Sequence, residues 1–451
     1  GWFGENVHDG NFCVDGLVSP DRIPSTGLLE YKNVITPVQI KMRDPKQWAN
    51  PHKPEFTITN RYDFTDFSNL IITYTIKSLN TVIATGTAEV NVLPHKSTIY
   101  VPEYELPQAT QYELIAEFEY KLKTACAWAD AGSLLGFSQH ILPVKILTQA
   151  ITLPEASKLY FENSDYTYNF AGSNFHYEFD SQTGAFTKII VNGHNLLAAP
   201  TSFTIHRAPT DNDRHIRHKW QASNMHLSSQ HLYSIDIEEI SDSTVTLRGK
   251  YAIVADSYMP HVKFSVIWKI FSTGEISVNI DAIVRPSIAC LPRFGLELVL
   301  SEDFEDLEYY GYGPTSSYID MHHHCKKALH KSTVSDQYTN YIFPQETGNH
   351  YATKWACISN AKDDKVTLKI ECTSNTLSEN NEFEFSALHY SSHDLDKAML
   401  DKDLIKRPET FIHIDCRQSG IGSHSCGPEL MEKYRFNEKA FAYSFRIVPE
   451  S

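Results

Sequence analysis

An alternation of apolar and polar residues marks several segments of the chain. From residue 112 to residue 122, apolar side chains occupy every even position, and Glu or Lys occupies all but one of the odd positions. Segments 72–77 and 175–179 show the same period of two. Because successive side chains of an extended chain point to opposite faces, this period predicts β-strands with one buried face. Asn192-Gly193 predicts a tight hairpin turn, since both residues tolerate positive φ.

Helical periodicity is nearly absent. The best candidate is the short segment 28–33, which follows Pro24. Residues 1–37 are rich in Gly and turn residues and do not alternate, whereas residues 38–149 carry strand signals at the spacing of a small β-sandwich. After the connecting stretch 143–154, residues 150–451 hold too many strand signals for one small sandwich and predict a large two-sheet domain. The predicted fold class is therefore mainly β.

Composition narrows the class further. A length of 451 residues predicts about three domains. The aromatic content of 12% favours strands, because aromatic side chains pack well on a pleated surface. The formal net charge is −15, and a broadly acidic surface repels phosphate backbones. We therefore expect no nucleic-acid partner.

The cysteines and the apolar segments indicate in which cellular compartment the protein is expected. Eight cysteines without a paired CxxC spacing fit a reducing compartment, so we expect a cytoplasmic protein. No N-terminal apolar leader is found, and no apolar run approaches the ~20 residues of a membrane helix, so we expect no membrane association. Residue 1 is Gly rather than Met, which leads us to expect a processed or partial chain.

Six short motifs follow one another along the chain and together resemble those of the glycoside hydrolase family 2 β-galactosidases. Their order over nearly the whole length makes the resemblance specific. They are the run Gly1–Val18 with Asp21-Arg22, Asn60–Phe64 with Asn69-Leu70, Arg207–Asp213, Tyr312-Gly313-Pro314 with Tyr318 and Asp320, Tyr341 with Pro344–Asn349, and Gly420-Ile421-Gly422 with Cys426-Gly427-Pro428.

The resemblance implies an architecture and a reaction. Residues 1–37 are expected to form the C-terminal tail of a (β/α)8 catalytic barrel, residues 38–149 an immunoglobulin-like β-sandwich, and residues 150–451 the large β-sandwich of the β-galactosidase small chain. Retaining β-galactosidases use a nucleophilic carboxylate and an acid about 5 Å apart. In the family both are barrel glutamates upstream of Gly1, so no catalytic residue is assigned here.

The resemblance also implies a metal site near the N-terminus. Phe12 is expected to offer its backbone carbonyl to a Na+ or K+ ion beside the galactose, with its ring lining that subsite, and Asp15 to supply a side-chain oxygen. Many relatives carry Asn at the position of Asp15, so the Asp in this chain adds a negative charge to the expected site. The alternative is that Phe12 is an ordinary buried side chain and that Asp15 belongs to a turn before Gly16. His8 replaces an Asn near a Mg2+ ion of the family; a locally hydrogen-bonded loop His is equally compatible.

Cys426 lies where some relatives place a Trp that stacks on the aglycone sugar, while others carry Cys in a similar run. Sulfur would provide a smaller apolar contact than an indole ring. The alternative is an ordinary loop Cys without contact to substrate. Phe12 and Cys426 are therefore the substrate-binding candidates.

Three other polar groups receive structural interpretations. Adjacent residues of an extended segment diverge, so we interpret His322-His323-His324-Cys325 as a solvated loop and not as a metal site. Asp211-Asn212-Asp213 could chelate a cation, but we favour a turn fixed by side-chain hydrogen bonds. Arg207 and Gln345-Glu346 are interpreted as polar ties within the domain.

The resemblance thus implies that the chain is part of a retaining β-galactosidase that hydrolyses terminal β-D-galactosides such as lactose. Its expected partners are the N-terminal portion or a large subunit of the same enzyme, in an oligomer. Two alternatives remain: a non-catalytic carbohydrate-binding or structural all-β protein, and a natural small subunit of a heteromeric enzyme. A fold alone does not decide among them. The upstream coding sequence would discriminate, because a barrel with two glutamates supports the enzyme.

Overall fold

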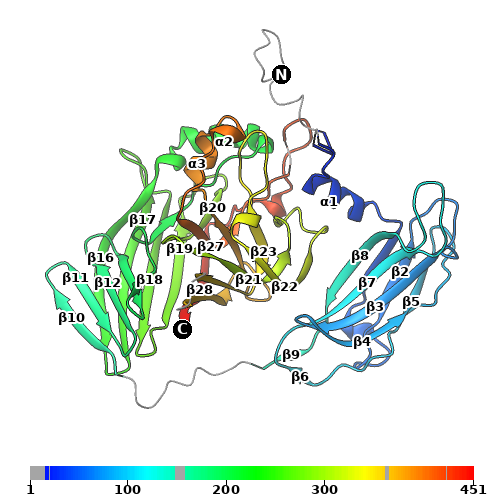
Figure 1. Ribbon diagram of the computed structural model, residues 1–451, viewed down its shortest axis with the longest axis horizontal. Helices are drawn as coiled ribbons and strands as arrows, with labels where there is room; N and C mark the ends of the chain where they lie inside the picture. Colours follow the sequence, from blue (N-terminus) through cyan, green and yellow to red (C-terminus); the bar gives the residue numbers. More distant parts are fainter. Residues whose placement is uncertain (1–15, 20, 148–157, 361–364, 423, 451) are drawn as a thin grey trace, which may run out of the picture. The chain divides into compact units, whose positions relative to one another are not determined.

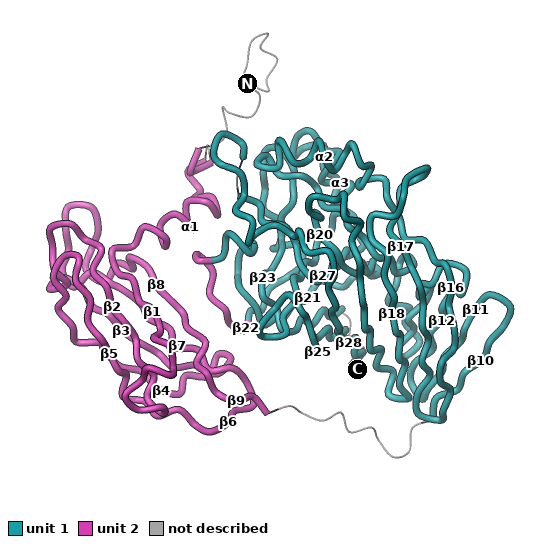
Figure 2. Tube along the Cα trace, turned by 180° about the vertical axis from the view of Figure 1, so that it is seen from behind, with its two compact units in different colours: residues 1–11, 152–322, 330–451 teal, residues 12–151, 323–329 magenta. Residues whose placement is uncertain are grey.

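A computed structural model describes the chain except for residues 1–15, 20, 148–157, 361–364, 423 and 451. The described residues are mainly β, with three short α-helices, which confirms the predicted fold class. They divide into two compact units, each considered by itself (Figure 2). Among the described residues, unit 1 draws on the ranges 158–322 and 330–450, and unit 2 on the ranges 16–147 and 323–329. Segment 323–329 therefore belongs with residues far from it in sequence.

Unit 2 consists of two small sheets and a short parallel pair (Figure 1). Its apolar core includes Ile72, Tyr74, Ile76, Phe118 and Tyr120, all at most 4% exposed. These are the apolar members of the alternating patterns, so the strand predictions for 72–77 and 112–122 are confirmed. The sheets are β1(Val38–Met42)-β2(Phe56–Asn60)-β5(Ser97–Tyr100), β4(Thr81–Thr87)-β3(Leu70–Ser78)-β7(Leu114–Leu122)-β8(Leu134–Ile141) and β6(Ala109–Thr110)-β9(Lys145–Ile146).

Two acidic residues on the polar side of the 112–122 segment, Glu113 and Glu117, are buried as well, which the alternation did not predict. Glu117 is 4% exposed, and its carboxylate accepts hydrogen bonds from Lys326 and Lys77, each at 2.9 Å. Lys327, 2% exposed, pairs with Glu113 at 3.1 Å. Segment 323–329 thus covers acidic positions that a lone strand would leave in water. Charge pairing makes that burial tolerable, since an isolated buried carboxylate is costly.

The predicted helix 28–33 is found as α1 (Thr26–Val34). The Ser25 hydroxyl caps it by accepting a hydrogen bond from the Leu28 N–H at 3.2 Å. None of its residues is buried. The helix is held through Asn33, whose amide donates to the Phe137 carbonyl of β8 at 3.1 Å and accepts from the Phe137 N–H at 2.9 Å.

Unit 1 contains three antiparallel sheets, one more than the sequence predicts; of strand β22 (Lys326–Thr333), only residues 330–333 belong to this unit. The strand prediction at 175–179 and the turn at Asn192-Gly193 are both confirmed: the turn residues have φ of 48° and 80°. The sheets are β16(Ser229–Ile240)-β17(Thr244–Val254)-β18(Val262–Phe271)-β19(Ile276–Val284)-β28(Ala440–Glu450)-β25(Thr367–Asn375)-β24(Trp355–Asn360)-β21(Phe304–Gly313)-β22(Lys326–Thr333), β15(Ser202–Thr204)-β20(Arg293–Leu300)-β27(Thr410–Gln418)-β26(Phe383–Leu388)-β23(Asn349–Thr353), and β10(Tyr160–Ser164)-β11(Thr167–Ala171)-β12(Phe175–Asp180)-β13(Ala185–Val191)-β14(His194–Asn195).

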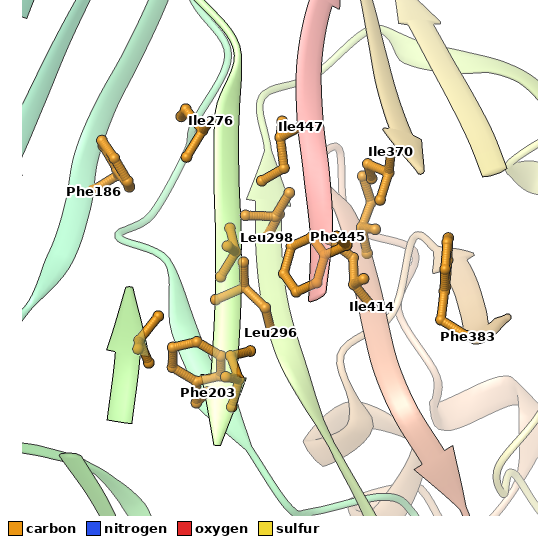
Figure 3. Packing of buried hydrophobic residues seen from close by; sticks show 14 of the residues in the cluster. Phe186, Phe203, Ile276, Leu296, Leu298, Ile370, Phe383, Ile414, Phe445 and Ile447 are labelled. Atoms are coloured by element: carbon orange, nitrogen blue, oxygen red, sulfur yellow. The ribbon is translucent and has the colours of Figure 1, made fainter. Parts of the chain in front are cut away.

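The core of unit 1 lies where these sheets face one another (Figure 3). Leu296 and Ile414 come from the five-stranded sheet that contains β20, whereas Phe445 and Ile447 come from the nine-stranded sheet. Each is at most 2% exposed. Burial of one such side chain contributes about 1.5–3 kcal/mol, so this layer supplies much of the stability of unit 1.

Short helices connect the strands of both units. In unit 1 the two α-helices are α2 (Ile216–Ala222) and α3 (Ser392–Lys397). No helix among the described residues is long and apolar enough to cross a membrane. The 3-10 helices are η2 (Pro45–Gln47), η3 (Asp211–Arg214), η4 (Met225–Leu227), η5 (Ser335–Gln337), η6 (Asp401–Asp403) and η7 (Glu432–Tyr434).

Buried neutral histidines should make the fold sensitive to acid. Burial lowers the pKa of His206 to about 3 and that of His140 to about 4, and it lowers the pKa of His413 as well. Each of the three has a buried ring nitrogen without a hydrogen-bond partner in the described structure. The unfolded chain binds protons below pH ~6.5 that the folded chain does not, so stability falls as the pH falls.

We predict that each of His140, His206 and His413, whose pKa is lowered by burial, reduces the free energy of unfolding by about 1.4 kcal/mol between pH 7.5 and pH 5.5, in urea titrations followed by circular dichroism. His206→Gln should remove one such contribution, even if the variant is less stable at pH 7.5. The matched control is His218→Gln, because His218 is exposed. An unfolding free energy that does not change over this pH interval would contradict the prediction.

Candidate functional site

The side chain of Arg207 lies completely buried at the centre of the candidate site. Its guanidinium donates to both oxygens of Asp213, at 2.9 and 3.0 Å, and to the Ser419 carbonyl at 2.5 Å. Burial disfavours the charge, but Asp213 and Glu346, with smaller contributions from Tyr318 and Asp320, together outweigh it and raise the pKa of Arg207. The motif Arg207–Asp213 therefore folds back on itself and holds residue 419 in place.

Asp213 also closes the short helix η3. Its carboxylate accepts from the Thr210 N–H at 2.8 Å, at the N-terminus of this helix. This confirms that Asp211-Asn212-Asp213 forms a turn stabilised by side-chain hydrogen bonds. The interpretation of Arg207 as an internal polar tie is confirmed by the same contacts.

Asp320 fixes the first residues of the loop that leads to Cys426. Its carboxylate accepts from the backbone N–H groups of Ile421 at 3.0 Å and Gly422 at 2.7 Å. Burial raises the pKa of Asp320, although these two N–H groups lower it. Gly420 is required by the close approach, since a Cβ there would lie 2.6 Å from the Asp320 carboxyl carbon.

A further motif joins this arrangement. The Gln345 side-chain oxygen accepts from the Asp211 N–H at 3.1 Å, and Glu346 lies 3.7 Å from Arg293, which is itself paired with Asp415. The motifs around residues 207, 320, 345 and 420 are thus brought together in unit 1. The order of these motifs along the chain can be read from the sequence, but their proximity in space cannot.

Cys426 lies in the exposed part of this loop, as a free cysteine. The loop is closed beside it by a hydrogen bond from the His424 N–H to the Pro428 carbonyl, at 3.1 Å. The His424 ring lies against the His215 ring, with centroids 4.2 Å apart. Cys426 is therefore exposed at the surface of unit 1.

The histidine tract has a different role from the one predicted. Glu30 of α1 accepts from the His323 ring at 2.7 Å and from the His324 ring at 2.8 Å, within unit 2. The His324 side chain is only 2% exposed and Cys325 is buried, so the solvated-loop prediction is wrong for these two residues. The reason is the pairing with Glu30, which lies about 290 residues away in sequence. Among the described residues no group of three His, Cys, Asp or Glu is placed to hold a metal ion.

The charges of this cluster reinforce each other. Burial raises the pKa of Glu30, but the hydrogen bonds from His323 and His324 outweigh it and hold the pKa well below its usual value. Burial lowers the pKa of His324, but its hydrogen bonds with Cys325 and Glu30 raise the pKa to about 9. Glu30 and His324 therefore form an ion pair at neutral pH that fastens α1 to segment 323–329.

The predicted metal and substrate residues Phe12 and Asp15, and the metal candidate His8, lie outside the described residues. Their roles remain predictions. Cys426 is the member of the predicted site that the structure describes. Sequence reasoning recognised Asp320 as part of a motif but missed its role in holding the loop, because that role depends on a contact across about 100 residues.

We predict that Asp320→Asn weakens the hold on the loop. Loss of a buried carboxylate acceptor costs about 1–3 kcal/mol, so the Ile421 and Gly422 amides should exchange with solvent deuterium about 10–100 times faster. The matched control is Asp403→Asn, an exposed residue in η6. Unchanged exchange at both amides would show that Asp320 does not hold the loop.

Comparison with known proteins places the chain in a family. The family model described as "Beta galactosidase small chain" matches residues 171–447, and the one described as "Beta-galactosidase, domain 4" matches residues 56–143. The chain is 34% identical to the Beta-galactosidase of Actinobacillus pleuropneumoniae, covering 99% of this chain and 42% of that protein. It is 30% identical to the Beta-galactosidase of Staphylococcus xylosus, covering 99% and 43% respectively. The chain thus spans less than half the length of these relatives, and over that span it belongs to the family of the β-galactosidase small chain.

Proposed function

We propose that this chain forms the C-terminal part of a retaining β-galactosidase that hydrolyses terminal β-D-galactosides such as lactose. The observation that carries the proposal is the small-chain family match over residues 171–447, together with relatives named Beta-galactosidase that align with 99% of the chain. In this proposal the nucleophile and the acid come from an N-terminal portion or a large subunit.

The chemistry of the described carboxylates supports this division. Retaining cleavage needs two carboxyl groups about 5 Å apart, both open to the sugar. The acids around the candidate site are engaged elsewhere: the buried Asp213 and Asp415 with Arg207 and Arg293, and the partly buried Asp320 with two backbone N–H groups. None of these three is placed to attack or protonate a glycoside, because each carboxylate is held by an internal partner.

The contribution of this chain would then be to shape the site. Cys426 would provide an apolar contact for the aglycone, and Phe12 and Asp15 would hold a Na+ or K+ ion beside the galactose, with His8 near a Mg2+ ion. An oligomer in the cytoplasm completes the proposal. The free state of Cys126, Cys290, Cys325, Cys357, Cys372, Cys416 and Cys426 supports a reducing compartment.

We predict that the purified chain alone does not hydrolyse a chromogenic β-galactoside, and that activity appears when the N-terminal portion of the enzyme is added. The reason is that cleavage requires a carboxyl pair that this chain does not supply. Release of the chromophore, measured with and without the added portion, checks this. Turnover by the isolated chain that survives repurification would overturn the proposed division of the site.

We predict that Cys426→Trp in the complete enzyme raises transfer of galactose to a sugar acceptor relative to hydrolysis. A stacked aromatic ring contributes about 0.5–1.5 kcal/mol, which corresponds to a ratio about 2–10 times higher. The rate of galactosyl-enzyme formation should change less. The matched control is Cys126→Trp, because Cys126 is also an exposed free cysteine. A change in galactosyl-enzyme formation with a constant transfer ratio would remove Cys426 from the aglycone side.

A further inference from the structure

The loop that carries Cys426 contacts η3 and the start of α2 at two points. The Asn212 side chain donates to the Ile421 carbonyl at 3.1 Å. Further along the loop, the His424 ring lies against the ring of His215, with centroids 4.2 Å apart and planes inclined by 35°. The first contact holds the start of the loop. The second contact is closer to Cys426 along the chain, so it bears more directly on where the thiol lies.

His215 lies on a firmly anchored part of unit 1. It stands at the junction of η3 and α2, just after Asp213, whose carboxylate is paired with the buried Arg207 at 2.9 Å. The helix α2 is anchored at Trp220, which is 5% exposed and donates to the Cys290 carbonyl at 3.2 Å. A side chain carried between two anchored points can serve as a fixed support for a neighbouring loop.

His424 has a backbone conformation that needs such support. Its φ of 63° lies in the left-handed region, which is costly for a residue with a Cβ. Its N–H donates to the Pro428 carbonyl at 3.1 Å and so closes the turn around Cys426. A strained conformation of this kind persists only where the surrounding contacts hold it. Two side chains approach the His424 ring: His215 by stacking, and Glu429, whose carboxylate lies 4.0 Å from the His424 Nδ1.

These two supports of His424 are not equivalent. The Glu429 side chain is 59% exposed and is bonded to Arg435 at 2.8 Å, so its attraction for the His424 ring is both screened by water and shared. Exposed ion pairs of this kind contribute little to stability. Aromatic rings in contact keep their attraction in water, because it rests on packing and on the electrostatics of the rings. The His215 ring is therefore the main support of His424.

We propose that His215 is a positioning residue for the aglycone side of the site. By stacking on His424, it fixes the turn 424–428 and with it the position of Cys426. The inference rests on the proposed function, in which Cys426 contacts the aglycone. It concerns positioning alone: His215 is assigned no contact with the substrate, and formation of the galactosyl-enzyme does not depend on it.

The effect on the loop is tested by hydrogen–deuterium exchange in the full 451-residue chain. His215→Ala should speed exchange in peptides that span 424–428 by about 2–10 times, the range expected for the loss of one aromatic contact. His215→Phe should restore slow exchange, because it keeps a ring at the same position. The matched control is His218→Ala, an exposed residue of α2, which should leave exchange in these peptides unchanged. His215 is itself exposed, so its substitutions should not prevent folding.

A double-mutant cycle separates the contact between the two rings from other effects. His424→Gly removes the second ring together with the strain of the left-handed backbone, since glycine adopts positive φ readily. In the His424→Gly chain, His215→Ala should therefore cause no further change in exchange, once each rate is expressed relative to that of an unstructured peptide. Additive effects of the two substitutions, or unchanged exchange in His215→Ala, would show that His215 does not support the loop.

The effect on the reaction is tested in the complete enzyme with a chromogenic β-galactoside and a sugar acceptor. His215→Ala should lower transfer of galactose to the acceptor relative to hydrolysis by about 2–10 times, whereas His215→Phe should keep the wild-type ratio. The rate of galactosyl-enzyme formation should change less. A fall in that rate with a constant transfer ratio would overturn the proposal. A wild-type enzyme without galactosidase activity would instead refute the proposed function, and the exchange data would still decide whether His215 holds the loop.

Discussion

The buried ion pair between Arg207 and Asp213 is the interaction on which the candidate site depends. Arg207 joins the turn at 210–214 to the end of β27 through the carbonyl of Ser419, and the loop that carries Cys426 begins at the next residue. Removing one partner of a buried pair costs about 3–5 kcal/mol, because the remaining charge loses its compensation. The start of the loop is therefore positioned by an electrostatic contact in the interior.

The same arrangement is extended by Arg293, which is paired with Asp415 of the neighbouring strand and lies 3.7 Å from Glu346. A buried ion pair adds little net stability compared with well-packed apolar residues of the same volume. Its effect here is to fix the position of strand ends and loops. Each pair is formed in only one arrangement, so other arrangements would leave a buried charge without its partner. The apolar layers between the sheets supply the stability, and the buried charges select the arrangement of the loops at their ends.

Unit 2 shows the same principle on a smaller scale. Its strands alternate as expected, but segment 323–329 covers the acidic face of β7 and brings His323 and His324 to Glu30. Lysines and histidines from one part of the sequence neutralise glutamates from another. A polar residue on a strand is therefore poor evidence of solvent exposure when a segment of opposite charge is available elsewhere in the chain.

The sequence by itself determined the local structure: the strands at 72–77 and 175–179, the helix near 28–33, and the turn at Asn192-Gly193. These follow from side-chain period, capping and backbone preference, which act over a few residues. The motifs around residues 207, 320 and 420 were also visible in the sequence. Only the tertiary structure decided that these motifs meet, that the side chains of Glu117 and His324 are buried, and that the rings of His215 and His424 lie against each other. Such contacts join residues that are from tens to hundreds of positions apart, and local preference carries no information about which distant partner will neutralise a charge or support a loop.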